Sequence, residues 1–116
     1  MSPLQTRPFG KNGPPVTIVG LGGEGILRSR GRNAQARPVI EDAASLGITY
    51  FDSARAYDES ELYLGRFWES RADLRSRAFQ TSNSARRDYA GAWDDLETSL
   101  HNLHTNRLDL WQMHDL

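Results

Sequence analysis

Strand-forming runs and helix-forming stretches alternate along nearly all of this 116-residue chain. The strand-forming runs, rich in β-branched, aromatic and other apolar residues, lie at 17–22, 48–52, 78–82 and 107–113. The helix-forming stretches lie between them, at 36–46, from about 60 onward and at 88–104. A chain with this order forms parallel strands joined by right-handed crossovers, with the helices packed outside the sheet. The sequence therefore predicts an α/β fold.

A small hairpin is expected before the first of these strands. Residues 3–7 and 15–19 can pair across a turn at 10–13, which contains glycine and asparagine residues that readily adopt positive φ. The prolines in both segments suit edge strands. No repeat, low-complexity tract or linker divides the chain, so residues 1–116 are expected to form one domain. That domain would hold an N-terminal hairpin, four parallel strands and three helices.

Apolar spacing predicts which faces of these elements are buried. The first and last strand-forming runs are apolar enough for buried strands, whereas the third is weaker. Pro38 is expected in the first turn of its helix, Gly47 at its end, and the Ser60 hydroxyl as the cap of the next helix. The expected inward residues are Val39, Ile40, Ala43 and Ala44, then Leu62, Leu64, Phe67 and Trp68, then Tyr89, Trp93, Leu96, Leu100 and Leu103.

Composition excludes several kinds of function. The formal net charge is −1, so we expect no nucleic-acid or membrane partner, and no run approaches the roughly 18 apolar residues of a membrane span. The absence of cysteine excludes disulfides, thiolate metal sites and thiol nucleophiles, and three scattered histidines lack metal-ligand spacing. We expect a soluble, cytoplasmic protein without a metal. Among the fourteen basic residues only Lys11 is a lysine.

A glycine-rich segment at 20–25 fits the G-x-G-x-x-G pattern and follows an apolar run, so three interpretations are open. A dinucleotide-binding turn needs its last glycines to open a helix, but a polar stretch with Arg28, Arg30 and Arg32 intervenes. The segment can instead be a strand end at which substrate or cofactor approaches the backbone, or a plain turn. The three arginines can attract a phosphate or form a solvated basic loop.

Three polar residues stand at or after predicted strand ends, where the active sites of parallel α/β folds are built. Taken alone, Asp52 can cap a turn, Tyr57 can be a partly buried anchor, and His114 can be a polar strand end. The segments around them point to a more specific interpretation.

Three segments, in the same order, resemble the aldo-keto reductase family. Residues 47–65, GITYFDSARAYDESELYLG, resemble its most recognisable signature. Residues 20–22 resemble the end of its first strand, and residues 108–114, LDLWQMH, resemble its fourth strand. The resemblance covers essentially the whole chain and implies a (β/α)₈ barrel that moves a hydride between NADPH and a carbonyl. This chain would then be a partial TIM barrel, its N-terminal half.

The resemblance also assigns roles to individual residues. Asp52 matches the aspartate of the family's catalytic tetrad, and Tyr57 matches the proton-donating tyrosine. His114 matches the histidine that orients the substrate. Gly22 and Gly23, at the first strand end, are the expected contacts to the cofactor, which the resemblance implies is NADP.

The fourth member of the tetrad, a lysine, is missing. The family places it at the end of the third strand, where this chain has Asn83, and Lys11 lies in the predicted hairpin turn. A nearby ammonium lowers the pKa of a tyrosine hydroxyl from its usual value of about 10, whereas a neutral amide brings no charge. We therefore expect hydride transfer to be slower by orders of magnitude than with lysine, and this chain to be inactive.

The resemblance implies that most cofactor contacts belong to the C-terminal half of the barrel. Four parallel strands cannot close a barrel, so the first and last strands are expected to present unpaired edges that invite pairing. The sequence thus predicts either a truncated and inactive reductase half, whose substrate would be a small carbonyl compound if it were active, or a non-catalytic half-barrel. The latter would be a relic fragment or a homodimer joined through its strand edges.

Overall fold

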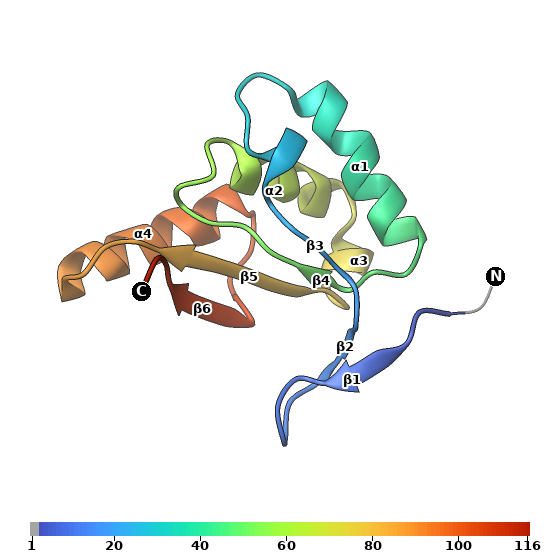
Figure 1. Ribbon diagram of the computed structural model, residues 1–116. Coiled ribbons are helices and arrows are strands. Elements are labelled where there is room, and N and C mark those ends of the chain that lie inside the picture. The colour runs from blue at the N-terminus through green and yellow to red at the C-terminus, as the bar shows by residue number, and fades with distance from the viewer. Residues whose placement is uncertain (1–2) are drawn as a thin grey trace.

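A four-stranded parallel sheet organises residues 3–116, the part of the chain that the computed structural model describes (Figure 1). Its strands lie side by side in chain order: β3 (Gly20–Leu21), β4 (Tyr50–Phe51), β5 (Phe79–Ser84) and β6 (Leu110–Met113). The connecting helices are η1 (Gly25–Leu27), α1 (Asn33–Ser45), α2 (Ser60–Ser70), α3 (Ala72–Arg75) and α4 (Tyr89–Asn102). In this part of the chain no helix is long and apolar enough to cross a membrane. The predicted order of parallel strands separated by helices is confirmed, but the described residues form two short helices, η1 and α3, in addition to the three that were predicted.

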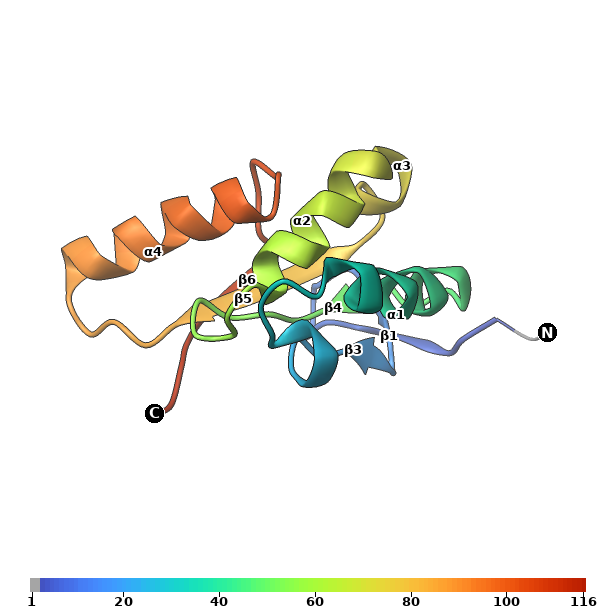
Figure 2. The ribbon, with the colours of Figure 1, turned by 90° about the horizontal axis from the view of Figure 1, so that it is seen from above.

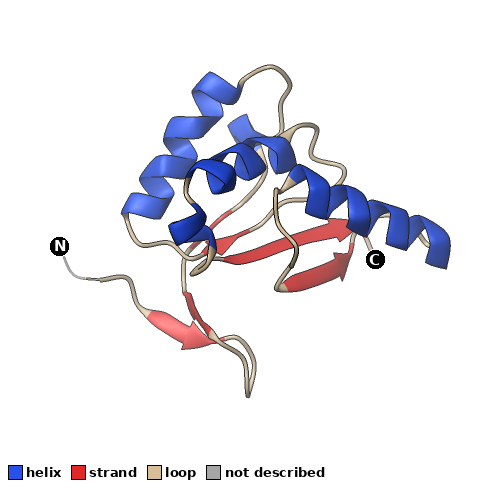
Figure 3. Cartoon of the chain, turned by 180° about the vertical axis from the view of Figure 1, so that it is seen from behind, coloured by secondary structure: helices blue, strands red, loops and turns tan. Residues whose placement is uncertain are grey.

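An antiparallel hairpin of β1 (Thr6–Pro8) and β2 (Pro15–Thr17) precedes the sheet, as predicted, with shorter strands than the sequence suggested. Figure 3 shows that the two strands of this hairpin form a separate sheet beside the four parallel strands. Phe9, just after β1, packs against Tyr50 and Phe79, with ring centroids 6.3 and 4.7 Å away. Tyr50 and Phe79 stack on each other at 5.3 Å. The hairpin thus packs against the first residues of β4 and β5.

The apolar core lies between the sheet and the helices α1 and α2. Phe51 of β4 meets Trp68 of α2 edge to face, with ring centroids 4.9 Å apart, and Phe67 packs against the same tryptophan. Ile40 of α1 and Leu64 of α2 are fully buried in the same cluster. Burying an apolar side chain of this size stabilises a fold by about 1.5–3 kcal/mol. The stability of the fold is therefore concentrated under α1 and α2.

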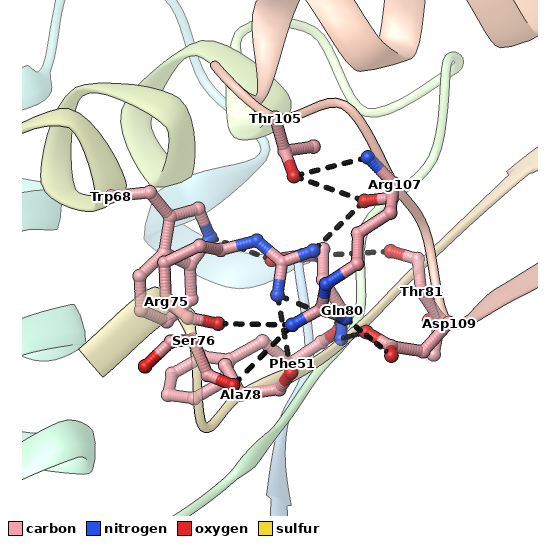
Figure 4. Close-up of polar contacts among 10 residues, drawn as sticks. All are labelled: Phe51, Trp68, Arg75, Ser76, Ala78, Gln80, Thr81, Thr105, Arg107 and Asp109. Atoms are coloured by element: carbon pink, nitrogen blue, oxygen red, sulfur yellow. Dashed lines mark hydrogen bonds and ion pairs between the residues drawn. The ribbon is translucent and has the colours of Figure 1, made fainter. Parts of the chain in front are cut away.

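A polar network ties β5 to its neighbours near the residue where β5 begins (Figure 4). The indole nitrogen of Trp68 donates to the buried Gln80 side chain at 2.8 Å. Asp109, just before β6, accepts from the Gln80 backbone amide at 2.8 Å and from Arg107 at 2.6 Å. Arg75 donates to the Arg107 carbonyl at 2.8 Å. These bonds hold α3 and the start of β6 against β5.

Helix α1 begins earlier than the sequence predicted. Its first residue is Asn33 rather than Ala36, because the Arg32 carbonyl already accepts a hydrogen bond from the Ala36 amide at 2.9 Å. Pro38 therefore lies in the second turn, not the first. The predicted end is correct: the helix stops before Gly47, whose φ of 93° favours glycine.

Helix α2 begins at Ser60, as predicted, but the serine does not cap it. Glu59 occupies the cap position, and the Ser60 hydroxyl bonds to the Ser53 hydroxyl at 2.8 Å instead. This buried pair holds the start of α2 against the segment that follows β4. Tyr63, which the predicted inward set left out, is buried, and its hydroxyl accepts from the Arg32 amide at 3.0 Å.

The predicted burial of the first and last strands is wrong. Residues 17–22 are divided between β2 and β3, and Ile18 and Val19 between them are 52% and 50% exposed. The chain changes partner there, from β1 to β4. In β6, Gln112 and Met113 are exposed because within the described residues this strand pairs only with β5. By contrast β5, predicted to be the weaker strand, is the longest, and all of its residues are buried.

Helix α4 departs furthest from its predicted burial. Tyr89 and Trp93, expected in the core, are 81% and 49% exposed, and within the predicted face only Leu103 is fully buried. Figure 2 shows the first turns of α4 projecting past the other helices. Val39 of α1 is exposed as well. Apolar spacing places residues on one face of a helix, but burial also requires an element opposite that face.

Candidate active site

Three predicted site residues lie at the carboxyl ends of neighbouring parallel strands. Asp52 follows β4, Asn83 is the next-to-last residue of β5, and His114 follows β6. Asn83 is in register with Gln112, two residues before His114. Because side chains alternate between the two faces of a strand, all of these residues belong to the face opposite α1 and α2, which we call the inner face.

Asp52 is half-buried and forms no ion pair with another described residue. Its carboxylate accepts a hydrogen bond from the hydroxyl of Thr81, an inner-face residue of β5. None of the ion pairs among residues 3–116 includes Asp52. Burial raises the pKa of this carboxyl group, and the Thr81 hydrogen bond and His114 lower it by less. The site therefore holds a partly desolvated carboxyl group that has no ion-pair partner among residues 3–116.

Tyr57 lies in the loop between β4 and α2, beside His114. Its ring is perpendicular to the imidazole, with centroids 5.6 Å apart. The Arg28 guanidinium lies 5.2 Å from the centre of the tyrosine ring and pairs with Glu24 at 3.2 Å. Burial raises the pKa of Tyr57, the charges of Glu24 and Asp52 raise it further, and Arg28 lowers it. The hydroxyl group therefore stays protonated at neutral pH.

Asn83 is 8% exposed and has one unsatisfied polar atom. Its side-chain nitrogen donates to the Ser53 carbonyl at 3.3 Å, and its backbone carbonyl accepts from the Arg55 amide at 3.0 Å. Its side-chain oxygen, Oδ1, is buried and has no hydrogen-bond partner. A neutral amide with an unpaired acceptor thus lies where the sequence resemblance expects an ammonium group.

His114 extends the site from the end of β6. Its backbone amide donates to the Ser84 carbonyl at 2.8 Å, which continues the ladder between β5 and β6 beyond the last strand residue. Its Nδ1 is buried without a partner, and its Nε2 lies 3.7 Å from the exposed Asp115 carboxylate. The four positions predicted as catalytic therefore lie together at the carboxyl ends of the strands.

A buried ion pair behind the site was not predicted. Glu61 of α2 is 1% exposed and accepts a hydrogen bond from Arg55 at 2.9 Å. It also accepts from Ser82 at 2.7 Å and from Asn102 at 3.3 Å, so it connects the loop after β4 to β5 and α4. The sequence carried a signal, because Glu61 stands three residues before the inward Leu64 on the same helix. A charge on that side of an amphipathic helix requires a buried partner.

The two glycines predicted to meet a cofactor have different surroundings. A β-carbon on Gly23 would lie 2.6 Å from the Asp52 carbonyl oxygen and 2.7 Å from the Ser60 hydroxyl, so only glycine permits this close packing. A β-carbon on Gly22 would meet nothing within 4 Å. Of the segment at 20–25, Gly20 and Leu21 form β3 and only Gly25 belongs to η1, a single 3₁₀ turn, while the first α-helix begins at Asn33. The segment therefore does not open a helix as a dinucleotide-binding turn would.

A hollow of about 780 Å³ runs along the inner face beside the site. Gly22, Asp52 and Gln112 line it, and Phe9 of the hairpin lines it as well. Among residues 3–116, no group of three or more His, Cys, Asp or Glu side chains can hold a metal ion. The hollow gives an organic molecule access to the Asp52 carboxyl group.

Known sequences and structures resemble this chain along most of its length. A sequence model of the aldo/keto reductase family matches residues 18–116. A solved structure from Pseudomonas aeruginosa, assigned to the aldo-keto reductases, shares 28% sequence identity with a TM-score of 0.79. The holo form of an aldo-keto reductase from Bacillus halodurans shares 22% identity with a TM-score of 0.80. A thermostable aldo-keto reductase in complex with the inhibitor epalrestat shares 24% identity with a TM-score of 0.81.

The chain spans less than half the length of each of these solved structures. The alignments include 95%, 95% and 96% of this chain, but 46%, 40% and 43% of the other chains. The likenesses at 22% and 24% identity are evidence of the fold alone. No curated protein matches the sequence. The open sheet is a partial (β/α)₈ barrel, as the sequence predicted.

Proposed function

Because the chain belongs to the aldo/keto reductase family, we propose that it forms part of a site that reduces carbonyl compounds with NADPH. The observation that carries this proposal is that Asp52, Tyr57 and His114 lie close together at the carboxyl ends of the strands. Small aldehydes or ketones are the proposed substrates. We also propose that hydride transfer in this chain is slow, because Asn83 brings no positive charge to the site.

Each of these residues has a role that its surroundings support. The Tyr57 hydroxyl, protonated at neutral pH, donates its proton to the carbonyl oxygen of the substrate. The His114 imidazole, held beside the tyrosine ring, orients that carbonyl group. Asp52 is linked electrostatically to both residues, because its charge raises the pKa of Tyr57 and His114 lowers the pKa of Asp52. NADPH, when bound, supplies the hydride.

The environment of Tyr57 supports slow turnover. A proton donor works best when its pKa lies near the working pH, and a neighbouring cation lowers the pKa of tyrosine toward that range. Here burial, Glu24 and Asp52 all raise the pKa of Tyr57, and Arg28 opposes them. The amide of Asn83 carries no charge that could lower it. The tyrosine hydroxyl is therefore a weak acid at neutral pH.

The described residues fit the nicotinamide end of the cofactor better than its phosphates. Gly22 leaves the end of β3 open to the hollow, so a flat ring can approach the backbone there. Two arginines of the nearby loop are already paired, Arg28 with Glu24 at 3.2 Å and Arg30 with Asp58 at 3.1 Å. A phosphate would have to compete with these carboxylates. We therefore propose that residues 3–116 by themselves bind NADPH weakly.

A fluorescence titration with NADPH tests this proposal. NADPH absorbs tryptophan emission, so cofactor bound near β6 quenches Trp111. The expected result is saturable quenching with a dissociation constant of about 100 μM or weaker. Gly22→Val tests the location of the bound cofactor. A side chain at this position has free space, so the variant should keep the fold, but it should weaken NADPH binding by about tenfold. A folded chain whose emission shows no saturable response to millimolar NADPH would overturn the proposal.

Exposed apolar residues favour self-association as a second candidate function. In the described part of the chain β3 and β6 are the two edges of the sheet, and the half-exposed Ile18 and Val19 precede β3. Open strand edges beside apolar side chains invite pairing with another chain. This second proposal is a two-fold homodimer in which β6 of each copy pairs with β3 of the other.

Light scattering tests the homodimer. At protein concentrations of tens of micromolar, the parent chain should have twice its monomer mass. Val19→Lys places a charge beside the edge strand and should give a monomer, because charged edges resist pairing. A parent chain that is folded and monomeric under these conditions would contradict the homodimer.

A further inference from the structure

The inner face carries two buried polar atoms that have no hydrogen-bond partner. Both belong to the candidate site: Oδ1 of Asn83 and Nδ1 of His114. Buried polar groups in folded proteins are nearly always paired, so unpaired atoms in a site point to a ligand that pairs with them. The chemistry of the surrounding groups indicates what that ligand is.

The Asn83 side chain can present only its oxygen to such a ligand. Its nitrogen donates to the Ser53 carbonyl at 3.3 Å, and exchanging the two ends of the amide would set two oxygens against each other. Oδ1 therefore points away from Ser53, and it remains buried because Asn83 is more than nine-tenths covered. The site thus contains a hydrogen-bond acceptor in a fixed orientation.

A carboxylate lies on the same face as that oxygen. Asp52 accepts from the Thr81 hydroxyl, and Thr81 and Asn83 are about 6.6 Å apart along β5. Ser53, whose carbonyl binds the Asn83 amide, directly follows Asp52 in the chain. Among residues 3–116 no ion pair supplies Asp52 with a cation. The Asp52 carboxylate and the Asn83 amide oxygen therefore belong to the same face at the ends of neighbouring strands, where His114 is the cationic group that acts on Asp52.

We propose that this site binds a small primary ammonium group between the Asp52 carboxylate and Oδ1 of Asn83. A primary ammonium has three N–H donors and no acceptor, so it can satisfy both oxygens. Its third donor can meet Nδ1 of His114 in the tautomer that accepts there. A hydroxyl group offers one donor and no charge, so it would leave the Asp52 carboxylate without a counter-ion. The proposal rests on the proposed function for its site, but the binding itself requires no cofactor.

An NMR titration with methylammonium chloride tests the proposal. Methylammonium, added up to about 100 mM to the full chain without NADPH, should shift the Asn83 side-chain amide and His114 ring signals along a saturable curve. Tetramethylammonium has the same charge but no N–H donor, so it should give no saturable shift at equal ionic strength. Sodium chloride gives the correction for ionic strength alone.

Two variants locate the binding site. Asp52→Asn keeps the size of the side chain but removes its charge, and it should weaken methylammonium binding by about tenfold or more. Asn83→Lys carries its own ammonium group, so the His114 signals should no longer respond to methylammonium. Asp42→Asn changes an exposed acid of α1 and should leave the affinity unchanged.

Several results would overturn the proposal. They are equal shifts with methylammonium and tetramethylammonium, no shift at about 100 mM, or unchanged affinity in Asp52→Asn. The NADPH titration gives an independent outcome. A chain that binds NADPH but not methylammonium keeps the proposed function and refutes the ammonium site. A chain that binds methylammonium but not NADPH keeps the ammonium site and refutes the proposed function.

Discussion

The two faces of the central sheet differ in how completely their side chains are paired and covered. On the face that packs against α1 and α2, which we call the outer face, Phe51 is buried against Trp68. There the Gln80 amide both accepts from Trp68 and donates to the Phe51 carbonyl. On the inner face, Asn83 and His114 keep unpaired polar atoms beside an open hollow. Strand β5 supplies residues to both faces, Gln80 to the outer and Asn83 to the inner. We conclude that the outer face provides stability, whereas the inner face is available for binding and chemistry.

The largest effect on stability is expected on the outer face. Phe67→Ala removes a buried ring that packs against Trp68 and should lower the free energy of unfolding by about 3–5 kcal/mol. Tyr89→Ala, at the exposed start of α4, is the matched control and should change it by less than about 0.5 kcal/mol. Urea unfolding followed by circular dichroism measures both. Equal losses of unfolding free energy in the two variants would show that the start of α4 is as deeply buried as α2.

The buried pair behind the site should give the next largest effect. Glu61→Ala leaves Arg55 with only its longer contact to Asp95 at 3.8 Å and leaves Ser82 and Asn102 without their acceptor, so it should lower the free energy of unfolding by about 2–3 kcal/mol. Glu69→Ala, an exposed acid on the same helix, should have an effect of less than about 0.5 kcal/mol. The same urea experiment compares them. If Glu61→Ala unfolds at the parent's urea concentration, the loop that carries Tyr57 does not depend on this pair.

A smaller loss is expected where two helices touch. A β-carbon on Gly65 would lie 1.9 Å from the Asn102 carbonyl oxygen, so Gly65→Ala must push α2 and α4 apart. We expect a loss of about 1–3 kcal/mol in the free energy of unfolding, measured by thermal or urea denaturation. Gly22→Ala has open space and serves as the control. A neutral Gly65→Ala would mean that the contact between α2 and α4 is loose.

The smallest effect belongs to the inner face and depends on pH. Burial raises the pKa of Asp52, so the folded chain holds this proton to higher pH than the unfolded chain does. Its contribution to stability is therefore fully present below the ordinary pKa of aspartate and is lost as pH rises through the raised value. Asp52→Asn should unfold at slightly higher urea concentration than the parent at pH 7, and at the same concentration at pH 3. A variant less stable than the parent at pH 7 would contradict this sign.

The order of elements and the gathering of Asp52, Asn83 and His114 could be predicted from the sequence, because parallel strands align their carboxyl ends. Burial could not be predicted as well. Trp68 and Trp93 both occupy apolar positions of amphipathic helices, but only Trp68 faces an element that covers it. Spacing identifies a face, whereas coverage depends on how the helices are placed in space.

The sequence could signal that Glu61 needs a buried partner, but it could not identify which residue that partner is. The pair between Arg55 and Glu61 spans a loop and the start of α2, so it depends on the path of the backbone rather than on helical spacing. The Ser60 hydroxyl was free to cap its helix, but the nearby Ser53 hydroxyl bonds to it instead. Which partner a polar side chain binds depends on residues that come close to it only when the chain folds.

We propose that Asn83 limits the chemistry of the inner-face site. The direct test compares the rate of NADPH oxidation with a small aldehyde for the parent chain and Asn83→Lys, at cofactor concentrations that saturate each protein. A lysine ammonium beside Asp52 should lower the pKa of Tyr57 and raise the rate by about 100-fold or more. Equal or lower rates in Asn83→Lys, with NADPH bound to both proteins, would contradict the claim.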